Sequence, residues 1–281
     1  MRSVMSGALA VSLWAVSPAS FAGTDTVPAL KHVMIVIFEN EDAGPSGQQP
    51  FFAKLAQGGA AFSDFHAEAH PSQPNYIALT SGGKQGVAND TPVNLGARNI
   101  ADLIEAKGKT WKVYAEDYPG NCFTGTTSGR YARKHNPFIS YTDISGDAQR
   151  CANIVNATQM ATDIANGQLP DYAFYVPNLD NDAHDTNLAY ADNWYSGAFG
   201  PLLTDRNFMD GMLLITTFDE STASGGNIIY ASLYGDMVKP GSTYSARADH
   251  YSLLRTIEDG LSLGNLAGAD SNAASIGGIW Q

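Results

Sequence analysis

Two long apolar runs stand out in the pattern of hydrophobic and polar positions. Residues 31–38 and 211–218 are predominantly apolar and lack the regular alternation of a strand with one face in water. Such runs are typical of central strands that helices cover on both faces. Each run ends abruptly in acidic residues, Glu39 after the first and Asp219-Glu220 after the second.

Shorter segments of alternating character fill the rest of the chain. Strand-like runs cover residues 60–66, 110–115, 171–176 and 227–234, and helical spacing covers residues 51–57, 76–80, 99–107, 152–165, 189–203 and 249–261. This alternation predicts an α/β fold with a mostly parallel central sheet and helices on both faces. Residues 116–150 interrupt the pattern and are rich in Gly, Pro, Thr, Tyr and Asn. Long irregular segments of this kind are usually lids or binding loops.

The amino terminus has the pattern of a signal peptide. Arg2 precedes a mostly apolar run at residues 4–16, and Ser20-Phe21-Ala22 provides small residues for cleavage. We therefore expect residues 1–22 to be removed and residues 23–281 to form a single catalytic domain, exported to a periplasm or secreted. The alternative is a buried first helix. No later run reaches the roughly 18 apolar residues of a membrane-spanning helix, so stable membrane insertion is not expected.

Net charge and cysteine content narrow the function further. The formal net charge is −12, which argues against nucleic acid and anionic membranes as partners because both require basic surface. An anionic substrate would need a locally positive site, and a bound metal cation is one way to provide it. Cys122 and Cys151 are the two cysteines, and in an oxidising compartment they are expected to form a disulfide. A metal site is the weaker alternative, because no Cys-x-x-Cys spacing is present.

A polar heptamer lies between the strand-like run 60–66 and the helix-like run that follows it. Its sequence is His70-Pro71-Ser72-Gln73-Pro74-Asn75-Tyr76. The two prolines restrict the backbone and place the hydroxyl of Ser72 at the start of the helix. Two interpretations remain open from this stretch alone. Ser72 is either an N-cap of the helix or a reactive hydroxyl in a functional site.

Polar residues also accumulate just beyond the carboxyl ends of the predicted strands. The set comprises Glu39-Asn40, Ser72, Asp180, His184, Asp219-Glu220 and His250 at the start of the last helix. In open α/β sheets these ends converge on one edge, where ligands bind. Clustered carboxylates repel one another unless a cation lies among them, and oxygen ligands with a few imidazoles suit a divalent metal. The alternative for each motif is local: turn residues at Asp180, a solvated loop at Asp219-Glu220, and a helix-terminal pair at His250.

Taken in order, six motifs resemble the phosphoesterase family of the alkaline phosphatase superfamily. They are Val36-Ile37-Phe38-Glu39-Asn40, the heptamer around Ser72, Arg133-Lys134-His135-Asn136-Pro137-Phe138, Val176-Pro177-Asn178 with Asp180 and His184, Phe218-Asp219-Glu220-Ser221, and Asp249-His250-Tyr251-Ser252-Leu253-Leu254. The family contains acid phosphatases and phospholipases C of the phosphatidylcholine type. The resemblance extends from about residue 31 to residue 261, and it implies an alkaline phosphatase-like fold.

The resemblance also implies roles for individual residues. Ser72 corresponds to the hydroxyl nucleophile that becomes phosphorylated and contacts the metal. The implied metal ligands are Glu39, Asn40, Ser72, Asp219, Glu220 and Asp180. His184 and His250 are expected to act as acids or to bind phosphate, and His135 and Asn75 to contact substrate. Two departures, Glu39 in place of Asp and Asp219-Glu220 in place of Asp-His, favour one divalent metal over a two-zinc site.

The expected activity is therefore that of an exported, metal-dependent, acid phosphatase-like phosphomonoesterase that hydrolyses small phosphate esters through a phosphoserine. A phospholipase C-type phosphodiesterase is the nearest alternative. A serine esterase is disfavoured, because Ser72 does not lie in a Gly-x-Ser-x-Gly elbow. The alternative of another class is a non-catalytic exported protein that binds a metal or another ligand, since fold alone does not fix function.

Overall fold

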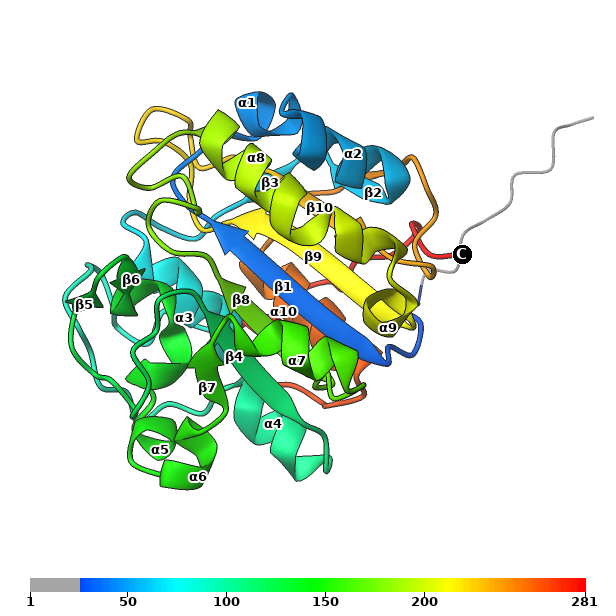
Figure 1. The fold of residues 1–281 in the computed structure, drawn as a ribbon. Helices are drawn as coiled ribbons and strands as arrows, with labels where there is room; N and C mark the ends of the chain where they lie inside the picture. Colours follow the sequence, from blue (N-terminus) through cyan, green and yellow to red (C-terminus); the bar gives the residue numbers. More distant parts are fainter. Residues whose placement is uncertain (1–25) are drawn as a thin grey trace, which may run out of the picture.

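The computed structural model describes residues 26–281, so the predicted signal peptide and its cleavage site lie outside the described residues. An eight-stranded sheet in the order β11-β2-β10-β9-β1-β8-β4-β7 forms its centre (Figure 1). The strands are β1 (His32–Phe38), β2 (Ala60–Phe62), β4 (Trp111–Ala115), β7 (Ile154–Asn156), β8 (Tyr172–Val176), β9 (Met212–Phe218), β10 (Ala231–Tyr234) and β11 (Ser242–Tyr244). Neighbouring strands pair in parallel except where β10 meets β9 and β2. The predicted mostly parallel sheet is confirmed.

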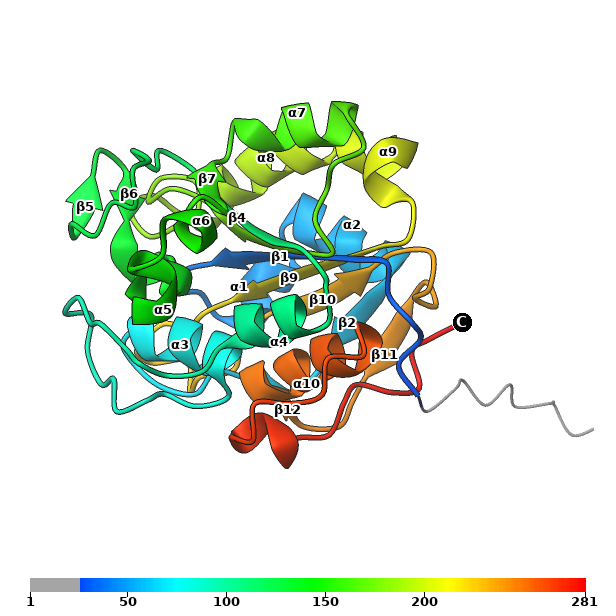
Figure 2. The same cartoon turned by 90° about the horizontal axis from the view of Figure 1, so that it is seen from below.

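Helices cover both faces of this sheet, as predicted. Figure 2 shows α7, α8 and α9 on one face and α3, α4 and α10 on the other. The α-helices are α1 (Ala43–Gly47), α2 (Pro50–Gly58), α3 (Gln73–Ser81), α4 (Ile100–Ala106), α5 (Thr142–Ser145), α6 (Ala148–Cys151), α7 (Gln159–Ala165), α8 (Leu188–Phe199), α9 (Arg206–Met209) and α10 (His250–Gly260). Short 3-10 helices are η1 (Arg133–His135), η2 (Pro137–Ser140), η3 (Pro201–Thr204) and η4 (Ala269–Ser271).

The register of the two central strands positions the acidic residues that follow them. Phe38 of β1 is opposite Phe218 of β9, and the backbone N–H of Asp219 donates to the carbonyl of Phe38 at 2.9 Å. Both phenylalanines are fully buried in an aromatic cluster with Phe52 and with Tyr195 of α8. The next residues along the two strands, Glu39 and Asp219, therefore leave the sheet side by side at its carboxyl edge.

Three sequence predictions are corrected by strand pairing. Residues 152–165 do not form one helix, because residues 154–156 pair with β4 as the edge strand β7 and the helix begins only at Gln159. The run 60–66 is divided into β2 and β3 (Phe65–His66), and β3 pairs with β12 (Ala248–Asp249) in a separate small sheet. The predicted strand at 227–234 is shorter and begins at Ala231.

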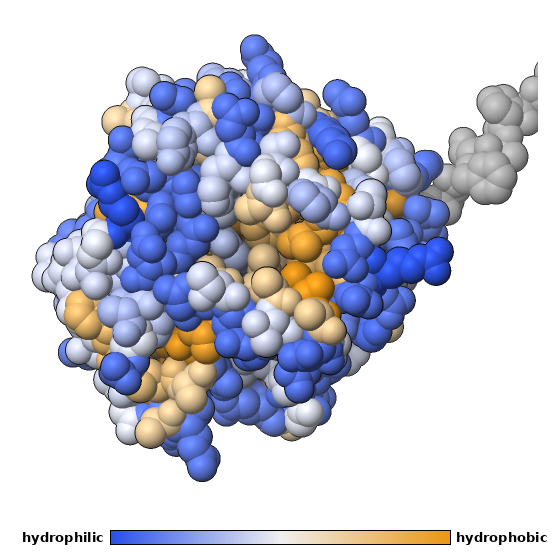
Figure 3. All heavy atoms as spheres, viewed as in Figure 1, coloured by the Kyte–Doolittle hydropathy of each residue, from blue (hydrophilic) through white to orange (hydrophobic). Residues whose placement is uncertain are grey.

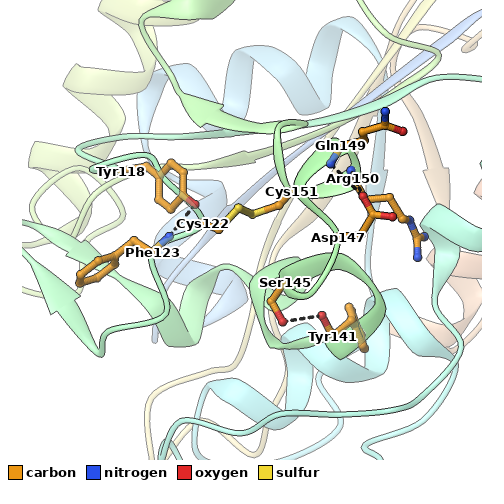
Figure 4. Close-up of a disulfide and its surroundings, with 9 residues drawn as sticks. All are labelled: Tyr118, Cys122, Phe123, Tyr141, Ser145, Asp147, Gln149, Arg150 and Cys151. Carbon is orange, nitrogen blue, oxygen red and sulfur yellow. Dashed lines mark hydrogen bonds between the residues drawn. A yellow bond between two sulfur atoms is a disulfide. The ribbon is translucent and has the colours of Figure 1, made fainter.

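The irregular segment at residues 116–150 is tied down by a disulfide. Cys122 is bonded to Cys151 at the end of α6, with their Cα atoms 5.8 Å apart, which confirms the predicted pairing (Figure 4). The loop that the disulfide closes contains the hairpin of β5 (Thr127–Ser128) and β6 (Tyr131–Ala132), followed by η1. Nearby, the hydroxyl of Tyr118 accepts the backbone N–H of Phe123 at 3.1 Å. Residues 133–135 therefore lie within the loop that the disulfide closes.

The surface contains hollows away from the carboxyl edge of the sheet. One of about 380 Å³ lies between α7 and α8, where Figure 3 shows apolar side chains, and it is lined by Met160, Ala161, Ile164, Ala165, Ala198, Leu202, Asp205 and Asn207. Another, of about 450 Å³, is lined by Arg206, Met209, Asp210 and Asp236 near the amino end of β9. Across residues 26–281, no helix has both the length and the apolar character needed to cross a bilayer.

Candidate active site

Ser72 is buried immediately before α3, and its hydroxyl faces two carboxylates. The hydroxyl donates to Oε2 of Glu39 at 2.8 Å, and its oxygen lies 3.2 Å from Oε1 of Glu220. The side chain makes no capping hydrogen bond to α3. The interpretation of Ser72 as a side-chain N-cap is therefore wrong, and its hydroxyl is directed at the acidic cluster instead.

The backbone N–H groups in the first turn of α3 have acceptors other than the Ser72 side chain. The backbone N–H of Gln73 donates to Oδ1 of Asp90 at 3.0 Å. Pro74 has no N–H to satisfy, and the N–H of Asn75 donates to the Ser72 carbonyl at 2.9 Å. Asn75 was expected to contact substrate. The structure instead turns its side-chain amide toward the backbone of residues 68–71.

Three carboxyl groups converge next to Ser72 from the ends of β1 and β9. Glu39 and Asp219 are fully buried, and Glu220 is nearly so. Burial, followed by the charges of Glu39 and Glu220, raises the pKa of Asp219 well above its usual range. Burial also raises the pKa of Glu220, and the contact of its Oε2 with Nδ1 of His70 partly opposes this effect. The three carboxyl groups therefore favour a bound proton or a nearby positive charge.

His135 forms a buried ion pair behind Glu39. Its Nε2 lies 2.7 Å from Oε1 of Glu39 and its Nδ1 lies 3.1 Å from Oδ2 of Asp182. Burial opposes the imidazolium, but the two carboxylates raise the pKa of His135 to about 9. Burial would likewise raise the pKa of Glu39, but His135 lowers it to about 2. Tyr76 stacks on the imidazole and donates its hydroxyl to Glu39 at 2.8 Å. Both ring nitrogens of His135 are thus engaged by the protein, although His135 was predicted to contact substrate.

Lys134 is a site residue to which the sequence motifs gave no role. Its Nζ lies 3.5 Å from Oγ of Ser72, 3.1 Å from Oδ2 of Asp90 and 3.3 Å from Nε2 of His184. Burial opposes its charge, but the carboxylates of Glu39 and Asp90 outweigh this and raise the pKa of Lys134. The signal that could have identified it was a lysine within the Arg133-to-Phe138 motif of an acidic chain. Lys134 places a positive charge beside the hydroxyl.

His184 and His70 lie on the solvent side of the cluster. His184 is partly exposed, its Nδ1 lies 2.8 Å from Oδ1 of Asp185, and its Nε2 faces Lys134. Its backbone N–H donates to Oδ1 of Asp182, whose carbonyl accepts the N–H of Glu39. The loop after β8 is thereby joined to the end of β1. His70 was also given no role from sequence, and it borders Glu220 from the opening turn of the heptamer.

His250 and Asp180 occupy positions different from those expected. His250 is fully buried, and its Nε2–H donates to the backbone carbonyl of Asp219 at 2.8 Å. Burial lowers the pKa of His250, which favours the neutral ring. Asp180 pairs with Arg130 at 3.1 Å and makes no described contact with the cluster around Ser72. Asp182, two residues later, is the aspartate of this loop that the structure brings into the site.

The residues that follow β1 and β9 provide oxygen atoms of the kind that a divalent cation binds. Oδ1 of Asn40 and Oδ2 of Asp219 are buried and have no hydrogen-bond partner in the described residues. Buried oxygens without a partner, on the residues that follow β1 and β9, suit a hard cation. Within residues 26–281, however, no group of three or more His, Cys, Asp or Glu side chains stands ready to hold a metal. A cation at this position would therefore need the amide oxygen of Asn40 and the hydroxyl oxygen of Ser72 as ligands, in addition to the carboxylates.

Known structures with the same arrangement place the fold in a class. A protein in the alkaline phosphatase superfamily from Vibrio parahaemolyticus superposes with a TM-score of 0.62 at 15% identity, over 89% of this chain and 72% of that one. The lipoteichoic acid synthase LtaP from Listeria monocytogenes gives 0.61 at 9% identity, over 89% and 78%. The molecule therefore has the fold of the alkaline phosphatase superfamily, as the motifs implied.

The family is defined more closely by sequence. A model of the Phosphoesterase family matches residues 45–264, and the chain belongs to that family. A probable acid phosphatase of Kluyveromyces lactis is 33% identical over 87% of this chain and 61% of its own length. A phosphatidylinositol-3-phosphatase of Mycobacterium tuberculosis is 34% identical over 98% of this chain and 92% of its own length. The chain thus spans 56–61% of the length of three fungal acid phosphatases and 92% of the mycobacterial relative.

Proposed function

We propose that this protein is a phosphoric monoester hydrolase that transfers a phosphoryl group first to Ser72 and then to water. The observation that carries the proposal is the hydroxyl of Ser72, which lies between Glu39 and Glu220 with the ammonium group of Lys134 at 3.5 Å. Phosphoryl transfer requires mainly positioning and charge stabilisation around a nucleophile. Membership of the Phosphoesterase family and the acid phosphatase relatives support the proposal.

The first half-reaction forms the phosphoserine. Oγ of Ser72 attacks phosphorus, its proton passes to one of the two carboxylates that the hydroxyl already faces, and the bond from phosphorus to the leaving oxygen breaks. Lys134 neutralises the non-bridging phosphoryl oxygens. His184, at the open side of the site, gives a proton to the leaving alkoxide.

The second half-reaction returns the enzyme to its starting state. His184 accepts a proton from water as the water oxygen bonds to phosphorus. The bond from phosphorus to Oγ then breaks, Oγ recovers its proton from the carboxylate, and inorganic phosphate leaves. We assign His250 a structural role rather than a proton-transfer role, because the described polar contact of its imidazole is with the backbone carbonyl of Asp219.

A divalent cation forms part of the proposal. Glu39, Asn40, Ser72 and Asp219 would hold it, because Ser72 contacts Glu39 and the buried oxygens Oδ1 of Asn40 and Oδ2 of Asp219 have no hydrogen-bond partner in the described residues. When bound, it would lower the pKa of the Ser72 hydroxyl and neutralise charge at the phosphoryl group. Glu220 and Asp180 are weaker candidates, since His70 and Arg130 respectively already contact them.

The substrate class proposed is the small phosphate monoester. A phosphate group on a phosphoinositide is a second candidate, favoured by the mycobacterial phosphatidylinositol-3-phosphatase that matches nearly end to end. We also propose that the protein is exported, which is supported by the predicted signal peptide and by the Cys122–Cys151 disulfide.

One set of assays separates these functions. The purified protein is tested on p-nitrophenyl phosphate, bis-p-nitrophenyl phosphate, p-nitrophenyl acetate and vesicles containing phosphatidylinositol 3-phosphate, each with and without a chelator. Chelator-sensitive release from the monoester is expected. Preference for the diester would indicate a phospholipase C-type enzyme, release from the acetate an esterase, and no turnover a ligand-binding protein.

A further inference from the structure

We infer that Asp90 is a positioning residue that holds both the turn carrying Ser72 and the ammonium group of Lys134 in place. The inference rests on the proposed function, because it concerns how Ser72 and Lys134 are held. Asp90 lies outside the heptamer and outside the Arg133-to-Phe138 motif, in the loop between α3 and α4. Its two carboxylate oxygens serve two segments that are far apart in sequence.

One oxygen fixes the turn that carries Ser72. Oδ1 of Asp90 accepts the backbone N–H of Gln73 at 3.0 Å, the first of the N–H groups at the start of α3 that have no acceptor within the helix. The side chain of Gln73 is buried and donates to the carbonyls of Asn89 and Thr91, both at 2.8 Å. The loop around Asp90 is thus bonded on both sides to the residue that follows the nucleophile. An acceptor from a distant loop thus satisfies the N–H next to Ser72, while the Ser72 hydroxyl faces Glu39.

The other carboxylate oxygen of Asp90 holds the ammonium group of Lys134. Oδ2 of Asp90 lies 3.1 Å from Nζ of Lys134, which is 3.5 Å from Oγ of Ser72. The Asp90 side chain is about one third exposed and that of Lys134 one fifth, at 33% and 19%, so the pair borders the opening of the site. Asp90 therefore orients Lys134 toward the phosphoryl position and also competes with phosphate for its charge.

Two substitutions separate these roles. Asp90→Ala removes both contacts, whereas Asp90→Asn keeps an acceptor for the Gln73 N–H but removes the negative charge and the oxygen that faces Lys134. For Asp90→Ala we expect kcat to fall about tenfold or more, because small misplacements of a nucleophile are costly, and the Gln73 amide to exchange with solvent faster. For Asp90→Asn we expect kcat within about threefold of wild type. Its inhibition constant for inorganic phosphate should fall about threefold or more, because a negative charge beside the anion is gone.

The control is Asp205→Ala, which removes an N-cap acceptor of α9, far along the chain from the site. It should leave kcat, the phosphate inhibition constant and Gln73 exchange unchanged. Equal loss of kcat in Asp90→Ala and Asp90→Asn, or wild-type kcat and Gln73 exchange in Asp90→Ala, would overturn the role in the turn. An unchanged phosphate inhibition constant in Asp90→Asn would overturn the link to Lys134. If Asp90→Ala does not fold, Asp90→Asn tests both roles. Its retained kcat supports the role in the turn, and its lower inhibition constant for phosphate supports the link to Lys134.

These outcomes are distinct from failure of the proposed function. If the wild-type protein hydrolyses no phosphate ester, the proposed function falls. The inference is then decided by amide exchange at Gln73 and by calorimetric titration with inorganic phosphate, neither of which requires turnover. Tighter phosphate binding by Asp90→Asn, with slow Gln73 exchange retained, supports it. Unchanged phosphate affinity, or fast exchange in both variants, overturns it.

Discussion

The Ser72 hydroxyl and the Glu39 carboxylate are 2.8 Å apart, although 33 residues separate them in the chain. The contact joins the start of α3 to the end of β1. A serine hydroxyl has one hydrogen, so Ser72 cannot donate fully to both Glu39 and Glu220 at the same moment. The proton that Ser72 would lose as the proposed nucleophile is therefore already shared between two acceptors.

Replacing the nucleophile should abolish turnover without unfolding the protein. For Ser72→Ala we expect kcat on p-nitrophenyl phosphate to fall at least about a thousandfold, because the residues of such a site act as a unit. Circular dichroism should remain that of the wild type, because α3 receives no cap from this side chain. Ser145→Ala, which removes a hydroxyl bonded only to the Tyr141 carbonyl, is the control and should stay fully active. Near-normal turnover by Ser72→Ala would exclude it as nucleophile.

The two histidines predicted as acids should behave differently. For His184→Asn we expect a loss of about a hundredfold on alkyl phosphates, typical of a missing general acid, and a smaller loss on p-nitrophenyl phosphate, whose leaving group needs no proton. For His250→Ala we expect a lower melting temperature, because the carbonyl of Asp219 loses its buried donor at a cost of about 1–3 kcal/mol. Its kinetic loss should not depend on the leaving group. A leaving-group dependence in His250→Ala, and none in His184→Asn, would reverse the two roles.

Metal binding should be visible in stability as well as in activity. A divalent cation that binds only the folded protein stabilises it by about 2.7 kcal/mol at a hundredfold excess over Kd. This corresponds to a rise of about 5–10 °C in Tm for a chain of this size. We expect one cation among Mg²⁺, Ca²⁺, Mn²⁺, Zn²⁺ and Fe²⁺ to produce such a rise in chelator-treated protein and to restore turnover.

Asp219→Asn should abolish that rise, and Asp205→Asn, at an exposed cap, should retain it. Constant Tm with every cation, together with full activity after verified metal removal, would contradict the metal site.

Stability should decline as pH rises, because of a buried carboxyl on α10. Burial, followed by the charge of Asp270, raises the pKa of Glu258 from 4.5 to about 9. Between these values the folded state binds a proton that the unfolded state has lost, so the contribution to stability is complete below pH 4.5 and lost by about pH 9. Tm measured from pH 4.5 to 9 should fall by several degrees in the wild type.

Glu258→Gln provides a neutral side chain of the same shape and should flatten this decline. Asp259→Asn, on the neighbouring and partly exposed residue, is the control and should keep the wild-type slope. A decline of equal slope in Glu258→Gln would assign the pH dependence to other groups.

The central strands and the acidic edge of the sheet were predictable because they depend on local composition. Runs that are apolar on both faces identify β1 and β9 as central strands without knowledge of their partners. The geometry of a parallel sheet then places the polar residues that follow them at its carboxyl edge. The edge strand β7 was not predictable, because its three residues are a strand only through pairing with β4. Lys134, Asp90 and Asp182 were missed as site residues for the same reason. Their contacts join segments that only the complete fold brings together.

The pairing of Phe38 with Phe218 makes the proposed phosphatase activity a probe of folding. A slip of one residue between β1 and β9 would turn every side chain of one strand to the opposite face, and Glu39 would no longer lie beside Asp219. The two strands belong to opposite halves of the chain, so their alignment is a long-range event that closes later than local helices. During refolding, helical signal should therefore return before phosphatase activity, and the delay between them should measure the time taken to align the centre of the sheet.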